Sequence, residues 1–117
     1  QPFDLVLLGM GADGHFASLF PGAANLQDGL AMDSGTDAIA TLPDPLPPEA
    51  PFARISLTLP RLLYAREVHL VVTGDDKRRV LRKAQRDGAE SAALAGHFPV
   101  AALLHAPGHH IRIHWSP

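Results

Sequence analysis

Two side chains that can exchange protons, Asp13 and His15, lie in a short segment that also holds Gly9, Gly11 and Gly14. An unperturbed imidazole has a pKa near 6.5, so at neutral pH it can take a proton from water and return it. The segment therefore predicts a general base, His15, with Asp13 as the acid beside it. In the alternative interpretation, Asp13 caps a short helix and His15 packs beneath that helix.

The residues before this segment indicate how it is positioned. Residues 3–8 form a continuous apolar run that ends at glycine, which is typical of a strand buried on both faces of a parallel sheet. The glycines that follow allow positive φ angles and a close approach of the backbone to a ligand. Open α/β sheets bind ligands at the carboxyl ends of their strands, so the Asp13 and His15 loop lies where a site is expected.

The spacing of Gly9, Gly11 and Gly14 also satisfies the glycine pattern of dinucleotide-binding loops. That motif requires a full crossover helix and a second strand that ends in an acid about twenty residues later. Here Pro21 and Gly22 limit any helix after the loop to about two turns, and no convincing strand precedes Asp33. We therefore interpret the glycines as part of another kind of site.

The rest of the chain alternates between strand and helix patterns. Residues 22–51, rich in Gly, Pro, Asp and Ser, predict a long loop with one short strand at 38–42. The expected elements after it are a weak strand at 55–59, a short helix at 60–63, a strand at 68–73, a helix from 75 to about 86, a short segment at 99–104 and a strand at 111–115. Such alternation is typical of a parallel α/β sheet.

Lys77 lies where the predicted second strand joins its helix. Cations in the first turn of a helix are disfavoured by a few tenths to about 1 kcal/mol, and a bound anion reverses that effect. Lys77 is therefore a candidate phosphate ligand, although Asp75 and Asp76 could simply neutralise the turn. The other cations of this helix are expected to form a solvated face: Arg78, Arg79, Arg82, Lys83 and Arg86.

Arg54 ends the proline-rich segment and begins a predicted strand, so its guanidinium could bind a phosphate or a sugar oxygen. An ion pair with Glu49 or Glu67 is the alternative. The adjacent histidines 109 and 110 suggest a metal site, but neighbouring residues on a strand point to opposite faces and no acid lies nearby. We expect no metal.

The overall composition limits the classes of function. The chain has 117 residues, 46% of them hydrophobic, ten basic against twelve acidic side chains and no cysteine. A net charge of -2 gives no general attraction to nucleic acid or to an anionic membrane, and no apolar run is long enough to span one. We expect a soluble protein of the cytoplasm. Because Gln1 and Pro2 lead straight into a strand, we also expect a partial chain.

The segment 9–21, GMGADGHFASLFP, resembles the signature of the 6-phosphogluconolactonases. The similarity continues through residues 54–60, 71–77 and 99–104 and ends in the closing His-Trp-Ser-Pro. It covers practically the whole chain but corresponds only to the carboxyl half of the family's domain. The resemblance implies that residues 1–117 are the carboxyl-terminal part of one three-layer α/β/α, Rossmann-like domain. The absent amino half would carry a phosphate loop rich in glycine and serine.

The resemblance also implies a reaction, the hydrolysis of 6-phospho-D-glucono-1,5-lactone to 6-phosphogluconate in the oxidative pentose phosphate pathway, without a cofactor. His15 would activate the water and Asp13 would orient His15 or a substrate hydroxyl. Lys77 aligns with the family's phosphate-binding lysine and would act with Arg54. Backbone amides between Gly11 and Gly14 would stabilise the oxyanion.

Two other functions stay open on the same scaffold. Glucosamine-6-phosphate deaminases have a similar Asp-Gly-His motif, but they place a glutamate five positions after the histidine, where this chain has Phe20. That difference disfavours ring-opening isomerase or deaminase chemistry. A sugar-phosphate-sensing domain without catalysis is the second alternative, and it would not need an intact Asp13 and His15.

Overall fold

The structure of this chain is a computed structural model that describes residues 1–42, 48, 52–94 and 96–117. Its main sheet has three parallel strands in the order β1, β4, β5, which span Phe3–Gly9, Ala65–Thr73 and Ile111–Ser116. Parallel neighbours cannot be joined by a tight turn, so each connection has to cross over the sheet. The parallel sheet and its helical connections confirm the predicted α/β fold.

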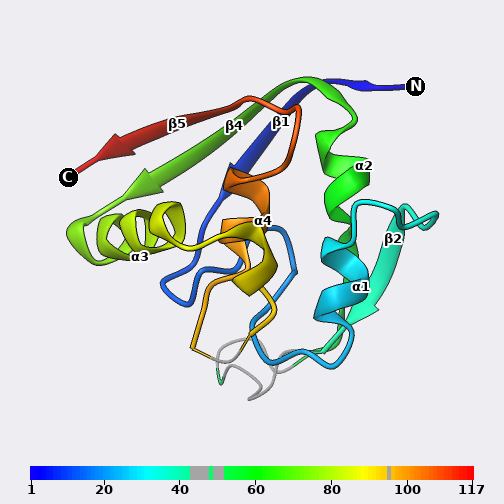
Figure 1. The fold of residues 1–117 in the computed structure, drawn as a ribbon, viewed down its shortest axis with the longest axis horizontal. Helices are drawn as coiled ribbons and strands as arrows, with labels where there is room; N and C mark the ends of the chain where they lie inside the picture. The colour runs from blue at the N-terminus through cyan, green and yellow to red at the C-terminus, as the bar shows by residue number, and fades with distance from the viewer. Residues whose placement is uncertain (43–47, 49–51, 95) are drawn as a thin grey trace.

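The connections contain the remaining elements, and Figure 1 shows their helices on one side of the sheet. Between β1 and β4 lie α1, Leu26–Leu30, then β2, Ala38–Thr41, β3, Arg54–Leu57, and α2, Leu59–Leu63. Between β4 and β5 lie α3, Asp75–Arg86, a 3₁₀ turn η1, Ala89–Ser91, and α4, Val100–Leu104. Strands β2 and β3 pair with each other in an antiparallel ribbon that is separate from the main sheet.

The core lies between the sheet and these helices. On β4, Leu70 and Val72 are almost completely buried, and they pack in one cluster with Phe16 and Leu19 of the first loop and Leu103 of α4. The alternate residues of β4 face away from this core, as the period of two in a strand requires. The loop that carries His15 is thus held on the core by its own apolar side chains.

Strand β1 differs from its prediction. The sequence indicates burial on both faces, but only Val6 and Leu8 are buried, whereas Leu5 is 55% and Leu7 67% exposed. Within residues 1–117 that expectation is wrong, because the described helices cover only one face of the sheet. A continuous apolar run does not reveal how many of its faces are covered.

The helix predicted after His15 does not form. Residues 10–22 make a series of turns in which Gly14 and Gly22 have φ near +80° and Ala17 has φ 51°, values that interrupt a right-handed helix. Conversely, α1 lies in the segment predicted as a loop, where Leu26 is buried and Leu30 packs against the core one turn later. Residues 43–47 and 49–51, including Glu49, lie outside the described residues.

The other predicted elements are confirmed with small shifts. Strand β2 forms within the expected range 38–42, α2 begins one residue early, and β4 begins three residues early. Helix α3 occupies its predicted range, with Leu81 and Ala84 buried and Val80 packed against the core. Helix α4 and β5 also form within a residue of the expected bounds.

Candidate functional site

The two sequence motifs meet at one edge of the sheet. The loop of residues 10–22 follows the carboxyl end of β1, and α3 follows the carboxyl end of β4 after Gly74. Because β1 and β4 are parallel, with Gly9 opposite Val71, both ends lie at the same edge. As a result, His15 and Lys77 line one hollow.

His15 is oriented by a hydrogen bond to the acid two residues before it. Its Nδ1 lies 2.6 Å from Asp13 Oδ1, and its backbone N–H donates to the same oxygen at 3.1 Å. An ionised carboxylate only accepts hydrogen bonds, so Nδ1 carries the proton and Nε2 presents its lone pair. The interpretation of Asp13 as a helix cap is wrong, because no helix follows it and it holds the imidazole instead.

The charge state of Asp13 agrees with this arrangement. Partial burial acts to raise the pKa of Asp13, but the hydrogen bonds from the His15 ring and backbone N–H and the electrostatic attraction of that ring outweigh this effect. The pKa of Asp13 therefore lies below its ordinary value, and at neutral pH the side chain is an ionised acceptor. The imidazole is 31% exposed, so water can reach the ring.

Gly11 and Gly14 shape the loop around the imidazole. A Cβ on Gly11 would overlap the ring of His15, and a Cβ on Gly14, at φ +81°, would overlap Phe98. The Gly11 N–H donates to the carbonyl of His15 and the Gly14 N–H to the carbonyl of Gly11, both at 2.9 Å. These two amides are engaged inside the loop, so the structure does not orient them toward an oxyanion, the role expected of them from the sequence.

Arg54 approaches the loop from the separate ribbon. It begins β3, and Ser56 on the same strand accepts a hydrogen bond from the Ser18 N–H at 3.0 Å, which joins β3 to the loop. Arg54 then lines a second hollow together with Asp13 and His15. Glu67, one of the acids considered as its partner, lies on β4 and contacts Arg112 at 3.3 Å.

The two predicted anion ligands occupy different hollows. Lys77 lines the hollow beside Gly9 and Gly11, whereas Arg54 lines the hollow beside Asp13, and the two hollows share His15. The geometry therefore brings each cation to the imidazole but does not place both cations in one pocket. A ligand with two polar ends could contact both.

Phe20, which the sequence analysis used only to distinguish the chain from the deaminases, also contacts the candidate site residues. Its ring centroid lies 4.4 Å from that of His15 and 4.8 Å from the guanidinium carbon of Arg54. It also lines the hollow that these two residues share. A signal was present in the sequence, since position 20 corresponds to the glutamate of the deaminases, but an apolar side chain there gave no reason to expect a contact with Arg54.

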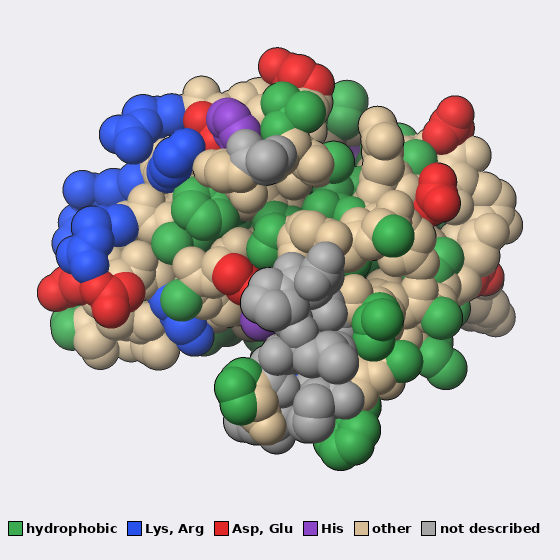
Figure 2. Space-filling model, turned by 90° about the horizontal axis from the view of Figure 1, so that it is seen from below, with side chains coloured by type: hydrophobic (Ala, Val, Ile, Leu, Met, Phe, Trp, Pro, Cys, Tyr) green, Lys and Arg blue, Asp and Glu red, His purple; other side chains and the backbone are tan. Residues whose placement is uncertain are grey.

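The basic side chains of α3 gather at one end of the molecule, where Figure 2 shows a group of lysine and arginine side chains. Arg79 pairs with Asp76 on the same helix, Lys83 lies 3.6 Å from Asp87, and Arg78 lies over the ring of Trp115. Among the ion pairs of the described residues, Lys77 takes part in none. It is half-buried and lines the His15 hollow, unlike the exposed Arg82.

Four other histidines contact partners outside the two hollows. His69 and His114 lie 2.8 Å apart across β4 and β5, His97 contacts Asp87 at 3.0 Å, and His105 Nε2 lies 3.0 Å from the carbonyl of Ala84. Within the described ranges, no group of three or more His, Asp or Glu side chains could hold a metal ion. No described helix is long and apolar enough to cross a membrane.

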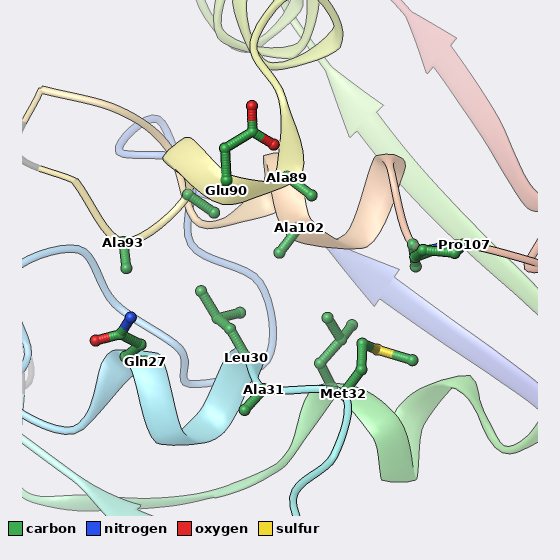
Figure 3. A pocket seen from close by; sticks show the side chains of 12 residues that line it. Gln27, Leu30, Ala31, Met32, Ala89, Glu90, Ala93, Ala102 and Pro107 are labelled. Atoms are coloured by element: carbon green, nitrogen blue, oxygen red, sulfur yellow. The ribbon is translucent and has the colours of Figure 1, made fainter.

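A further pocket lies between α1, η1 and α4, away from the imidazole. Figure 3 shows Ala93 and Ala102 on one side of it and Leu30 and Met32 on the other. Its lining is mainly aliphatic, and Glu90 is its one titratable residue. It offers no pair of groups that could activate water, so the chemistry is better placed at His15.

Comparison with known proteins shows the family of the chain. Residues 1–115 match the family described as glucosamine-6-phosphate isomerases/6-phosphogluconolactonase. The chain is 42% identical over 115 residues to a 6-phosphogluconolactonase of Caulobacter vibrioides, covering 98% of this chain and 45% of the relative. A 6-phosphogluconolactonase of Pseudomonas putida is 38% identical, with 99% of this chain and 43% of the relative covered.

A solved structure shows the same arrangement of elements. The crystal structure of a 6-phosphogluconolactonase from Shewanella baltica superposes with a TM-score of 0.81 at 34% identity, covering 99% of this chain and 45% of that chain. The present chain thus spans a little under half the length of these relatives. The match over residues 1–115 and the superposition agree, and the chain belongs to the glucosamine-6-phosphate isomerase/6-phosphogluconolactonase family.

Proposed function

We propose that this protein hydrolyses 6-phospho-D-glucono-1,5-lactone to 6-phosphogluconate, a step of the oxidative pentose phosphate pathway. The observation that carries the proposal is the imidazole of His15, held by Asp13 at 2.6 Å and lining one hollow with Lys77. An oriented base beside a cation suits a substrate that has both an ester and a phosphate. Relatives that bear the lactonase name support the choice of substrate.

The proton on Nδ1 defines the first step. Nε2 of His15 removes a proton from a water molecule as the water oxygen attacks the lactone carbonyl carbon, and Asp13 stabilises the imidazolium that results. The tetrahedral intermediate then collapses, the bond from the acyl carbon to the ring oxygen breaks, and Nε2 returns its proton to that oxygen. The product acid ionises, and the base is regenerated without a cofactor.

The cations fix the substrate around this base. Lys77 binds the phosphate, and its position in the His15 hollow sets the distance between the phosphate and the acyl carbon. Arg54 faces the imidazole from the second hollow, where a guanidinium can bind a sugar oxygen or the negative charge that forms at the carbonyl. Binding energy at the phosphate end thereby orients the reacting end.

Ring-opening isomerase or deaminase chemistry is less well supported. The residue that packs against His15 is Phe20, which has no acidic group to exchange protons with the imidazole. Release of ammonia from an aminosugar phosphate would support deamination. A domain that only senses sugar phosphates would bind without turnover, and an intact Asp13 and His15 pair would then have no use.

Two further proposals concern the protein as a whole. Residues 1–117 form the carboxyl-terminal part of a single catalytic domain, which accords with their coverage of 45% of the Caulobacter vibrioides relative. The reaction takes place in the cytoplasm on a small sugar-phosphate lactone, with no nucleic acid or membrane partner. The absence of cysteine is compatible with a reducing compartment.

Steady-state kinetics on the protein as the organism makes it tests the activity. We expect His15→Ala to lower kcat by about 10²- to 10⁴-fold with little change in fold. Lys77→Ala should mainly raise KM for the phosphorylated lactone, because it removes a binding contact. Matched controls are His110→Ala and Arg82→Ala, which change exposed side chains outside both hollows. Full turnover by His15→Ala would show that the base is wrongly identified.

A further inference from the structure

The imidazole of His15 has two supports of different kinds. Asp13 contacts its edge at Nδ1, and the ring of Phe20 lies beside it with a centroid separation of 4.4 Å and an interplanar angle of 32°. A single hydrogen bond fixes one atom of the ring but lets the plane swing about the bond. An aromatic neighbour at this distance restricts the plane, so the two contacts together define where Nε2 points.

The same phenyl ring also contacts the cation of the second hollow. The guanidinium carbon of Arg54 lies 4.8 Å from the Phe20 centroid, within the range of a cation–π contact. Phe20 therefore touches both the base and the cation that line its hollow, and these two come from separate parts of the fold, the loop after β1 and the first residue of β3.

Phe20 is itself firmly held. It is 7% exposed and belongs to the core cluster, next to the fully buried Leu19. Its carbonyl accepts a hydrogen bond from the Ala23 N–H at 3.3 Å, which ties the end of the loop to the segment before α1. A ring anchored in the core can set the orientation of two partly exposed polar groups.

We propose that Phe20 is a positioning residue of the site, whose ring fixes the plane of the His15 imidazole and the position of the Arg54 guanidinium relative to each other. This proposal rests on the proposed hydrolysis for its kinetic consequence and on geometry alone for the contact itself. Phe20 does not line the hollow of Lys77, so it acts on the reacting end of the substrate and leaves the phosphate end unchanged.

Two substitutions distinguish the effect of the aromatic ring of Phe20 from the effect of its side-chain volume. Phe20→Leu keeps an apolar side chain but removes the aromatic face, and we expect kcat to fall by about 10- to 100-fold, as a small misplacement of a catalytic group does. KM should change by less than about threefold, because the Lys77 hollow is intact. Phe20→Tyr keeps the ring and should restore kcat to within about threefold of the wild type.

The matched control is Phe3→Leu, which removes another ring that lies under an arginine, Arg61, at 3.8 Å and at the opposite end of β1. It should leave kcat and KM unchanged. Wild-type kcat in a folded Phe20→Leu variant would overturn the proposal. So would a loss confined to KM, or a Phe20→Tyr variant as impaired as Phe20→Leu.

A second readout does not depend on turnover. The Phe20 ring current should shift the proton resonances of the His15 ring in NMR spectra of the wild-type protein and of Phe20→Tyr, and the shift should disappear in Phe20→Leu. Unchanged His15 resonances in Phe20→Leu would refute the contact. A wild-type protein without lactonase activity but with the expected shifts would refute the proposed function and leave the positioning contact standing.

Discussion

The proposed hydrolysis depends on a proton at His15 Nδ1. It is placed there by an ionised Asp13, whose carboxylate accepts from both the ring and the backbone N–H of His15. Asp13→Asn removes the negative charge of this side chain and keeps its shape. The variant therefore tests the contribution of the charge separately from that of the side-chain volume.

In Asp13→Asn, we expect kcat to fall by about 10²- to 10⁴-fold, because the neutral amide no longer stabilises the imidazolium that forms when Nε2 takes a proton from water. KM should change little, since Lys77 still binds the phosphate. Steady-state kinetics checks this, and a variant with wild-type kcat would show that the charge of Asp13 does not assist the base.

The same variant tests how Asp13 makes the stability of the folded protein depend on pH. Because the pKa of Asp13 is lowered in the folded protein, its contribution to stability is present above the ordinary aspartate value, near 4, and is lost as the pH falls through the lower folded value. The difference in unfolding free energy between the wild type and Asp13→Asn should be at most about 1 kcal/mol at pH 7, since the pair is partly exposed. Urea unfolding at pH 7 and below pH 4 should show that difference shrinking; a constant difference would contradict this explanation.

The sequence predicts helices and strands well where the apolar residues follow a clear periodicity or where a glycine or proline marks the end of an element. The apolar run of β4 and the glycine before α3 fix that junction, so Lys77 is found where the sequence places it. The loop after β1 was interpreted less well, because two turns of helix and a series of tight turns have similar composition. The turns at Gly14 and Ala17 depend on contacts with α4 and β3, and these contacts are distant in sequence.

The junction between β4 and α3 contains a conformation that only glycine adopts readily. Gly74 has φ 91° and ψ 157°, its N–H donates to the Ser116 carbonyl at 3.0 Å, and its own carbonyl accepts from Trp115 Nε1 at 3.0 Å. A Cβ on Gly74 would meet nothing within 4 Å, so the cost of a side chain there comes from the strained backbone conformation and not from a steric clash. This turn sets the direction in which α3, and with it Lys77, leaves the sheet.

Gly74→Ala should destabilise the protein by about 1–3 kcal/mol, the usual cost of a non-glycine residue in this region of φ and ψ. Denaturant unfolding measures the loss. Gly35→Ala is the matched control, because it also adds a Cβ into open space but at a position without a positive φ. Equal stability of the two variants would show that the turn tolerates a side chain without strain.

At the scale of residues 1–117 as a whole, the described helices cover one face of the sheet and leave the other open. The described helices pack on the side of Val6, Leu8 and Leu70, while Leu5 and Leu7 are exposed on the other side. The sequence could not distinguish these two faces, since the residues of β1 are equally apolar on both. It did predict that the segments of His15 and Lys77 meet at one edge of the sheet, because parallel strands bring their carboxyl ends together whatever covers their faces.

The central claim is that one substrate bridges the two halves of this edge, with its acyl carbon at His15 and its phosphate at Lys77. A crystal structure of the protein as the organism makes it, with 6-phosphogluconate bound, tests this most directly. We predict the phosphate within hydrogen-bond reach of Lys77 Nζ, about 3 Å, and the carboxylate of the product beside His15 Nε2. A phosphate bound away from Lys77, or a carboxylate remote from the imidazole, would contradict it.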